Sequence, residues 1–284
     1  MPYNSGNCNY ISSKTVYPSR GKQKSNYYYI PFPQFDEFIY NKWVNIKKAN
    51  KLILGPNFVP NSWEYFPIGS IWQERRFSEI LNDVKGIAVH SKRVINHLIS
   101  RTNINTSSLF KKFKIIRPCT NIKPKNINPF PKRKIDILFF EKYQDLDRSQ
   151  QGIQLLNLLS NTSKKIERLK YGNYTKESMK YLANNTKFVI YFSFFDTGAI
   201  GLKEFQNYGV FIFSHQREFI INKNSCYYVP ELANEKDMNQ AFQIIMKKIE
   251  LITNMNPNAQ LIAKINQEIN KCENALNDLC ENIL

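Results

Sequence analysis

The stretch that decides the fold spans residues 187–214 and reads KFVIYFSFFDTGAIGLKEFQNYGVFIFS. Phe188–Phe192 is almost wholly apolar, which is typical of a strand buried on both faces of a parallel sheet. A turn follows, and then a segment with apolar residues at helical spacing, which Gly209 closes. A second apolar run, Val210–Phe213, predicts the next strand. The stretch therefore predicts a β-turn-α-β unit whose turn lies where open α/β sheets bind ligands.

Two carboxylates flank the predicted turn. Asp196 lies in the turn, and Glu204 follows after seven intervening residues, within the predicted helix. Gly198 stands at the helix start, where unpaired backbone N–H groups and the helix dipole favour an anion. A helix that holds a phosphate at its start and offers a carboxylate to sugar hydroxyls suits a nucleotide sugar. The alternative is that Glu204 is a solvated helix residue and Asp196 a charge at the helix N-terminus. The full strand, turn, helix and strand pattern favours the donor site.

The composition is that of a globular chain. Its 284 residues, with 42% hydrophobic and 14% aromatic residues, are enough for one large domain or two of ordinary size. No apolar run has transmembrane length, and the first residues lack the apolar centre of a signal peptide, so we expect a cytoplasmic location. The five cysteines are scattered without the spacing of a zinc site, and we interpret them as free thiols.

The formal net charge is +17. Such an excess can indicate nucleic acid, an anionic membrane surface or an anionic substrate as the partner. Here the basic residues are spread along the whole chain, and Asn and Ile are abundant too, as in products of AT-rich genomes. We favour this compositional explanation over a nucleic-acid partner, and peripheral contact with a membrane is the second interpretation.

Strands alternate with helices on both sides of the central stretch, which predicts an α/β protein with two parallel sheets. Residues 1–26 are polar without periodicity and predict a loosely held arm. Residues 118–134 carry four prolines and five basic residues, and we place the inter-domain linker there. The predicted domains are therefore 1–125 and 126–284. The other predicted strands are 27–30, 51–54, 86–90, 114–117, 135–140, 166–169 and 226–229, and the other predicted helices are 34–50, 70–83, 91–100, 149–160, 175–184, 235–254 and 257 to the end.

The central stretch resembles the donor-binding motif of GT-B-fold glycosyltransferases, above all the large retaining group called family four. That motif is Glu, seven residues, Glu, then a short helix that ends in Gly and a buried strand. Asp196 stands at the first acidic position here and Glu204 at the second. The resemblance implies two Rossmann-like domains with a cleft between them, the amino-terminal domain being reduced. It also implies that Glu204 binds donor hydroxyls, and that Asp196 and the turn residues Thr197, Gly198 and Ala199 face the donor.

The resemblance extends through the second half of the chain. ILFFEK, residues 137–142, looks like the family's first strand and the loop after it, where an Arg, and a Lys a few residues on, hold the donor diphosphate. Lys142 stands at the Arg position, while Gln151 stands where the family has its Lys, so that this cation is missing. Arg148 is a nearby replacement. For both Lys142 and Arg148, a solvated loop charge is an equally weighted alternative.

Residues 171–174, YGNY, resemble the loop that passes the nucleotide base. In that interpretation, the backbone near Gly172 reads the base edge and Tyr174 stacks on the base. An ordinary turn is the alternative.

His90 ends the predicted strand 86–90 and is a candidate general base or a contact of the transferred sugar, with a structural histidine as an equally weighted alternative. His215, in the loop after the last strand of the central stretch, could also reach the donor.

Asp145-Leu146-Asp147 matches a metal–nucleotide pattern of another glycosyltransferase fold, but we interpret it as loop and helix-cap charge. We therefore expect no metal and no bound cofactor.

The sequence thus predicts a hexosyl- or pentosyltransferase. It would move a sugar from a nucleoside-diphosphate donor to a hydroxyl of a glycan, a lipid or a protein-linked acceptor, and the family resemblance implies retention of configuration. The alternative hypothesis is a basic α/β protein that binds nucleic acid or a membrane surface and has a degenerate donor site.

Overall fold

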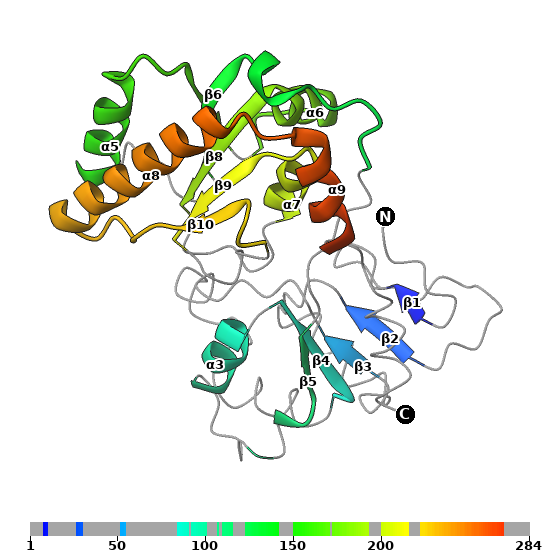
Figure 1. Cartoon of the computed structure of the whole chain (residues 1–284). Helices are drawn as coiled ribbons and strands as arrows, with labels where there is room; N and C mark the ends of the chain where they lie inside the picture. Colours follow the sequence, from blue (N-terminus) through cyan, green and yellow to red (C-terminus); the bar gives the residue numbers. More distant parts are fainter. Residues whose placement is uncertain are drawn as a thin grey trace. The chain divides into compact units, whose positions relative to one another are not determined.

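The computed structural model describes residues 8–10, 27–30, 52–54, 84–90, 92–100, 107, 110–115, 123–141, 150–170, 172–192, 200–215 and 222–269. The chain divides into two compact units, one formed by Met1–Pro118 with Cys272–Leu284 and the other by Cys119–Lys271. Each unit has its own five-stranded parallel sheet (Figure 1).

The first unit is organised by a sheet whose strands follow chain order, β1-β2-β3-β4-β5. Helix α3 (Lys92–Ser100) follows β4. Because the order never reverses among the strands described in this unit, they offer no switch point at which a ligand crevice would open. The strands are β1 (Cys8–Tyr10), β2 (Tyr27–Ile30), β3 (Leu52–Leu54), β4 (Gly86–Val89) and β5 (Phe113–Ile115).

Four of these strands, β2 to β5, confirm the sequence prediction. Strand β5 begins at Phe113, one residue earlier than predicted, because Phe113 is its buried member. The prediction of a loose arm over residues 1–26 is wrong at Cys8–Tyr10, which pairs in parallel with β2. Three residues are too few to display a strand period, so only the neighbouring strand reveals this one. The predicted helices 34–50 and 70–83 lie outside the described residues.

The second unit has the strand order β10-β9-β8-β6-β7, all parallel. From β6 the chain first adds β7 on one side, and then crosses to add β8 on the other. The order therefore reverses between β6 and β8. The strands are β6 (Ile135–Glu141), β7 (Ile166–Lys170), β8 (Thr186–Phe192), β9 (Phe211–Ser214) and β10 (Cys226–Tyr228), and the helices are α5 (Gln150–Ser160), α6 (Lys176–Asn185), α7 (Ile200–Asn207), α8 (Glu235–Met255) and α9 (Ala259–Ile269).

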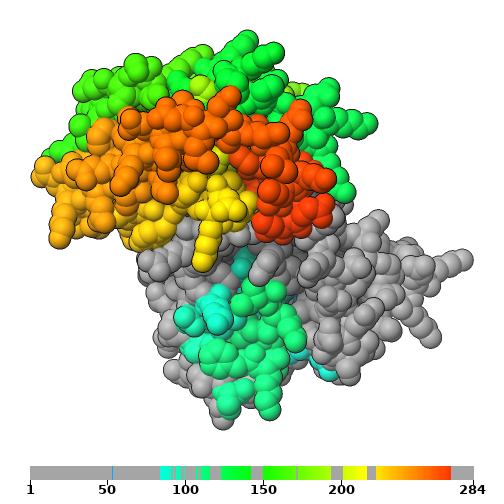
Figure 2. All heavy atoms as spheres, viewed as in Figure 1, coloured from blue at the N-terminus to red at the C-terminus, as the bar shows by residue number. Residues whose placement is uncertain are grey.

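Helices cover both faces of this sheet (Figure 1), because successive strand residues point to opposite faces. On β6, Ile137 and Phe139 join the core cluster that includes residues of α5 and α8, whereas Leu138 and Phe140 join the cluster that includes residues of α6 and α7. Helices α8 and α9, orange to red in Figure 2, form much of the surface on the face shown. The predicted α/β class with two parallel sheets is confirmed.

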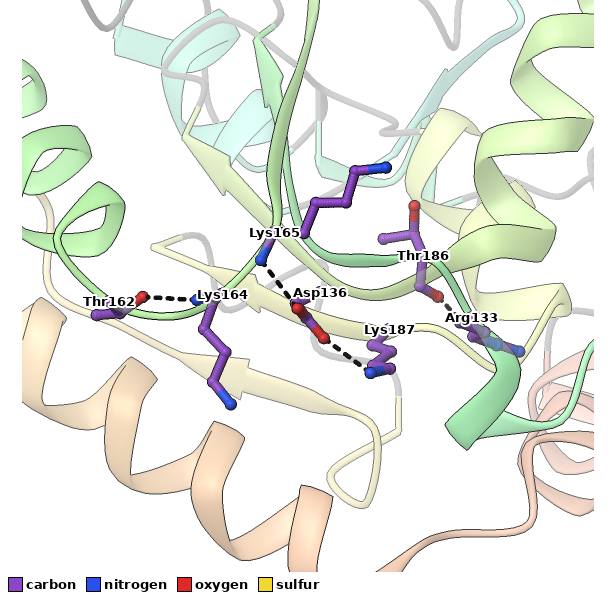
Figure 3. Close-up of polar contacts among 7 residues, drawn as sticks. All are labelled: Arg133, Asp136, Thr162, Lys164, Lys165, Thr186 and Lys187. Atoms are coloured by element: carbon purple, nitrogen blue, oxygen red, sulfur yellow. Dashed lines mark hydrogen bonds and ion pairs between the residues drawn. The ribbon is translucent and has the colours of Figure 1, made fainter.

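Charged groups fix the amino-terminal edge of the sheet (Figure 3). The Lys187 ammonium donates to Asp136 Oδ1 at 2.7 Å, and the Lys165 backbone N–H donates to Oδ2 at 2.9 Å. Burial alone would raise the pKa of Asp136, but these two donors hold its pKa below the usual value.

A buried arginine ties the predicted linker to the same edge. Arg133 is 3% exposed and donates to the backbone carbonyls of Asn128, Thr186, Tyr208 and Gly209. Burial lowers the pKa of its guanidinium to about 10, which leaves it charged at neutral pH. Arg133 therefore joins the segment before β6 to the start of β8 and to the turn that ends α7.

Candidate functional site

The carboxyl ends of the parallel strands meet at one edge of the second sheet. Glu141, the last residue of β6, lies in register with Lys170 of β7 and Phe192 of β8, which also end their strands. The reversal of strand order lies between β6 and β8. This edge is therefore the candidate site, because ligands of open α/β sheets bind beyond the carboxyl ends at such a reversal.

Helix α7, which follows β8, packs tightly onto the sheet near this edge. A Cβ on Gly201 would lie 2.7 Å from Cε1 and 3.0 Å from Cζ of Phe140, so only glycine allows this close approach. Leu202 and Phe205 are buried beneath the helix. The sequence motif draws attention to Gly198 and gives no role to Gly201. The available signal for Gly201 is its position inside a helical segment, where a glycine often marks close packing.

Helix α7 carries Glu204 in its second turn, partly buried. Burial raises the pKa of the Glu204 carboxyl, and the positive charge of Lys176 opposes that rise. Burial, together with the Glu204 charge, also raises the pKa of Tyr208, which stands four residues further along the chain. The candidate carboxylate is therefore partly shielded from water, so hydrogen bonds to it are stronger than at an exposed position.

The loop after β7 reaches the same part of the unit. Gly172 is exposed and has φ +87°, the left-handed region, with open space around its Cα. Tyr174 is half-buried, and its ring meets the Phe140 ring edge to face at a centroid distance of 6.1 Å. Since Gly201 packs on that same ring, the structure brings the YGNY loop and helix α7 together on Phe140.

A capping box fixes the start of α6, which places Lys176. The Thr175 hydroxyl accepts from the Ser178 backbone N–H at 3.1 Å, and the Thr175 N–H donates to the Ser178 hydroxyl at 2.9 Å. Helix α6 contacts α7. This arrangement explains how the charge of Lys176 reaches Glu204.

A buried ion pair at the end of β6 is a feature that the motif does not indicate. Arg168 of β7 donates to Glu141 through Nε at 2.6 Å and through Nη2 at 3.0 Å. The Glu141 side chain is 2% exposed and that of Arg168 33%. A Glu that directly follows an apolar strand run is the only sequence signal, and nothing in the sequence identifies its partner.

The two candidate histidines lie in different units. His90 directly follows β4 in the first unit and is 7% exposed. His215 follows β9, and its ring stacks on Phe192 with centroids 5.6 Å apart. His215 therefore lies at the candidate edge of the second sheet.

Six predicted site residues lie outside the described residues, in the segments 142–149 and 193–199, so their placement stays a prediction. They are Lys142, Arg148, Asp196, Thr197, Gly198 and Ala199.

Within the described part of the chain, no three His, Cys, Asp or Glu side chains gather as a metal site. No helix described in the structure is long and apolar enough to cross a membrane.

The sequence matches no known family model and no curated protein. The fold, in contrast, matches solved structures. The lipopolysaccharide outer core galactosyltransferase WaaB is 12% identical with a TM-score of 0.57, over 92% of this chain and 76% of that one. A TarM variant of S. aureus, in complex with fondaparinux, α-GlcNAc-glycerol and UDP, is 12% identical with a TM-score of 0.55, over 90% of this chain and 54% of that one.

The catalytic domain of starch synthase IV from Arabidopsis thaliana, bound to ADP and acarbose, is 8% identical with a TM-score of 0.54, over 92% of this chain and 72% of that one. This chain thus spans little more than half of the TarM chain. The likeness shows that the chain has the GT-B fold of these glycosyltransferases. The finer resemblance to family four stays a prediction.

Proposed function

We propose that this chain is a glycosyltransferase that moves a sugar from a nucleoside-diphosphate donor to a hydroxyl acceptor. The observation that carries the proposal is the place of Glu204, in the helix that follows β8 at the edge where strand order reverses. The GT-B fold adds support, because UDP and ADP are bound in two of the similar structures.

Each described site residue has a role in this proposal. The partly buried Glu204 carboxylate accepts hydrogen bonds from donor hydroxyls, which is favourable because charged hydrogen bonds gain strength away from water. In the proposal Tyr174, whose ring packs on Phe140 in the loop after β7, stacks on the nucleotide base. The helix α7 backbone begins at the same edge, and its first N–H groups suit the diphosphate.

The transfer itself exchanges one bond for another. The bond between the sugar C1 and the phosphate oxygen breaks, a bond from C1 to the acceptor oxygen forms, and the acceptor hydroxyl gives up its proton. The diphosphate leaves with the electron pair, so cations stabilise the developing charge. In the proposal Lys142 and Arg148 supply such cations, while Asp196 and His90 are candidates to face the transferred sugar.

The finer features of the proposal come from the family resemblance. They are retention of configuration at C1, independence of metal, and a hexose or pentose as the transferred sugar. The acceptor hydroxyl belongs to a glycan, a lipid or a protein-linked sugar.

The test is a calorimetric titration with UDP, GDP, ADP and CMP, followed by an assay of sugar transfer from the matching nucleotide sugar. We expect one nucleotide to bind, and Glu204→Ala to weaken binding by about tenfold or more, the value of a hydrogen bond to a charged group. Glu250→Ala is the matched control, since Glu250 is an exposed acid of another helix, α8.

A wild-type protein that binds no nucleotide would contradict the proposal. In that case, binding of a short nucleic acid with steep salt dependence would favour the alternative of a basic binding protein.

A further inference from the structure

The ion pair between Glu141 and Arg168 stands at a special place in the second sheet. Glu141 ends β6, directly beside the reversal of strand order, and is in register with the last residues of both neighbouring strands. Arg168 lies in register with Phe139, so its side chain reaches two residues along β6, toward the carboxyl edge, to meet Glu141. The pair therefore lies at the edge where the donor binds in the proposed function.

The two members of the pair differ in burial: Glu141 lies in the core, whereas Arg168 lies on the edge strand β7. Glu141 alternates with Ile137 and Phe139 on one face of β6, and both of those residues are buried in the core that includes α5 and α8. A buried carboxylate is costly unless it is paired, and Arg168 provides the partner of Glu141. The location of the pair, at the carboxyl edge beside the reversal of strand order, suggests a ligand.

The geometry of the pair suits recognition of an anion. Two nitrogens of the guanidinium bind the two oxygens of Glu141, which fixes the orientation of the Arg168 plane. A third of the Arg168 side chain is exposed, whereas Glu141 is almost completely covered. A guanidinium has five N–H donors and stays charged, so an oriented arginine can contact phosphate oxygens as well as its carboxylate partner.

We propose that Arg168 is a diphosphate-binding residue of the donor site and that Glu141 positions it. The proposal rests on the proposed function, and it adds a cation that the motif does not contain. Gln151 stands where the related enzymes have a lysine. Arg168 comes from the neighbouring strand β7 and supplies positive charge beside Glu141, the last residue of β6.

The experiment replaces two ion pairs of the same sheet and measures anion binding. The test variant is Glu141→Gln with Arg168→Gln, at the carboxyl edge. The matched control is Asp136→Asn with Lys187→Gln, an ion pair between neighbouring strands at the amino-terminal edge. Both double variants keep the net charge of the chain, so non-specific attraction of anions is the same in each. Thermal melting checks that each variant is folded.

Inorganic pyrophosphate and the nucleoside diphosphates UDP, GDP and ADP are the probes. We expect the test variant to lose about tenfold or more in affinity for pyrophosphate and for the bound nucleotide, because hydrogen bonds to a charged group are lost. The control should keep the wild-type affinity. If the Gln pair fails to fold, Glu141→Leu with Arg168→Met provides an apolar pair of similar size for the same measurement.

Two results would overturn the inference: a folded test variant that binds pyrophosphate and nucleotide as tightly as wild type, or an equal loss in the control. Wild-type protein that does not bind pyrophosphate measurably would also count against it. The proposed function fails separately if pyrophosphate binding depends on Arg168 and no nucleoside diphosphate binds more tightly than pyrophosphate.

Discussion

The close contact between helix α7 and the sheet provides the sharpest test of how the site is built. Gly201→Ala adds one methyl group whose carbon would lie 2.7 Å from Cε1 of Phe140. That distance is about 0.8 Å shorter than the ~3.5 Å at which two carbon atoms attract each other. The Phe140 ring cannot turn aside, because it is 3% exposed and packs against Tyr174, Tyr191 and Phe205 at centroid distances of 6.1, 5.5 and 5.9 Å.

The magnitude follows from two opposing terms. Overpacking of a buried position costs about 1–3 kcal/mol. Replacement of glycine by alanine inside a helix returns at most about 1 kcal/mol. We therefore expect Gly201→Ala to lower the free energy of unfolding by up to about 2 kcal/mol. Because the helix must move away from the sheet, Glu204 moves with it, and the affinity for the nucleotide falls as well.

Urea denaturation followed by circular dichroism measures the change, in a cycle with Phe140→Leu. Leucine removes the ring atoms that meet the new methyl group, so Gly201→Ala should cost about 1–3 kcal/mol less, the overpacking term, in the Phe140→Leu background than in wild type. Equal costs in the two backgrounds would refute the idea that Phe140 is the reason for glycine at position 201.

Two further predictions concern another glycine and a lysine. Gly209→Ala should lower the free energy of unfolding by more than about 3 kcal/mol, because φ is +71° and the new Cβ would lie 2.2 Å from the Ala259 carbonyl oxygen. At Gly172, φ is +87° but the space around it is open, so Gly172→Ala should lower it only by the backbone strain of about 1–2 kcal/mol. Melting temperatures of both variants decide this, and equal losses would contradict the role of the Ala259 contact. Lys176→Met should raise the pKa of Glu204 further, because the charge that opposes the effect of burial is removed. Nucleotide binding needs the ionised Glu204 carboxylate, so the affinity falls as the pH drops through that pKa. In the Lys176→Met variant the affinity should therefore be lost at a higher pH than in wild type. Calorimetry across a pH series measures the pH at which half of the affinity is lost, and an unchanged value would show that Lys176 has no influence.

Several elements of the second unit follow from local sequence. The apolar run of β8 predicts a buried strand, and the structure extends it back to Thr186, which pairs with Ile135. Gly209 predicts the end of α7, and its positive φ explains why a glycine stands there. The cap at Thr175 and the spacing of buried residues in α8 act within a few residues of chain, so the sequence displays them directly.

The candidate site is only partly visible in the sequence. The spacing of the motif predicts Glu204 as a donor-binding residue, since strand, turn and helix are consecutive, and this role stays a prediction. It does not identify Gly201, because the need for glycine arises from Phe140, on a strand about sixty residues earlier in the chain. It gives no indication that Tyr174 contacts the same ring.

The sequence by itself determined the alternation of strands and helices and the parallel character of both sheets, because these depend on local periodicity and spacing. Only the tertiary structure decided the strand order β10-β9-β8-β6-β7, the parallel pairing of Cys8–Tyr10 and the partnership of Glu141 with Arg168. The physical reason is that strand order, register and buried ion pairs depend on which segments become neighbours across the sheet, and the period of a single segment carries no record of its neighbour.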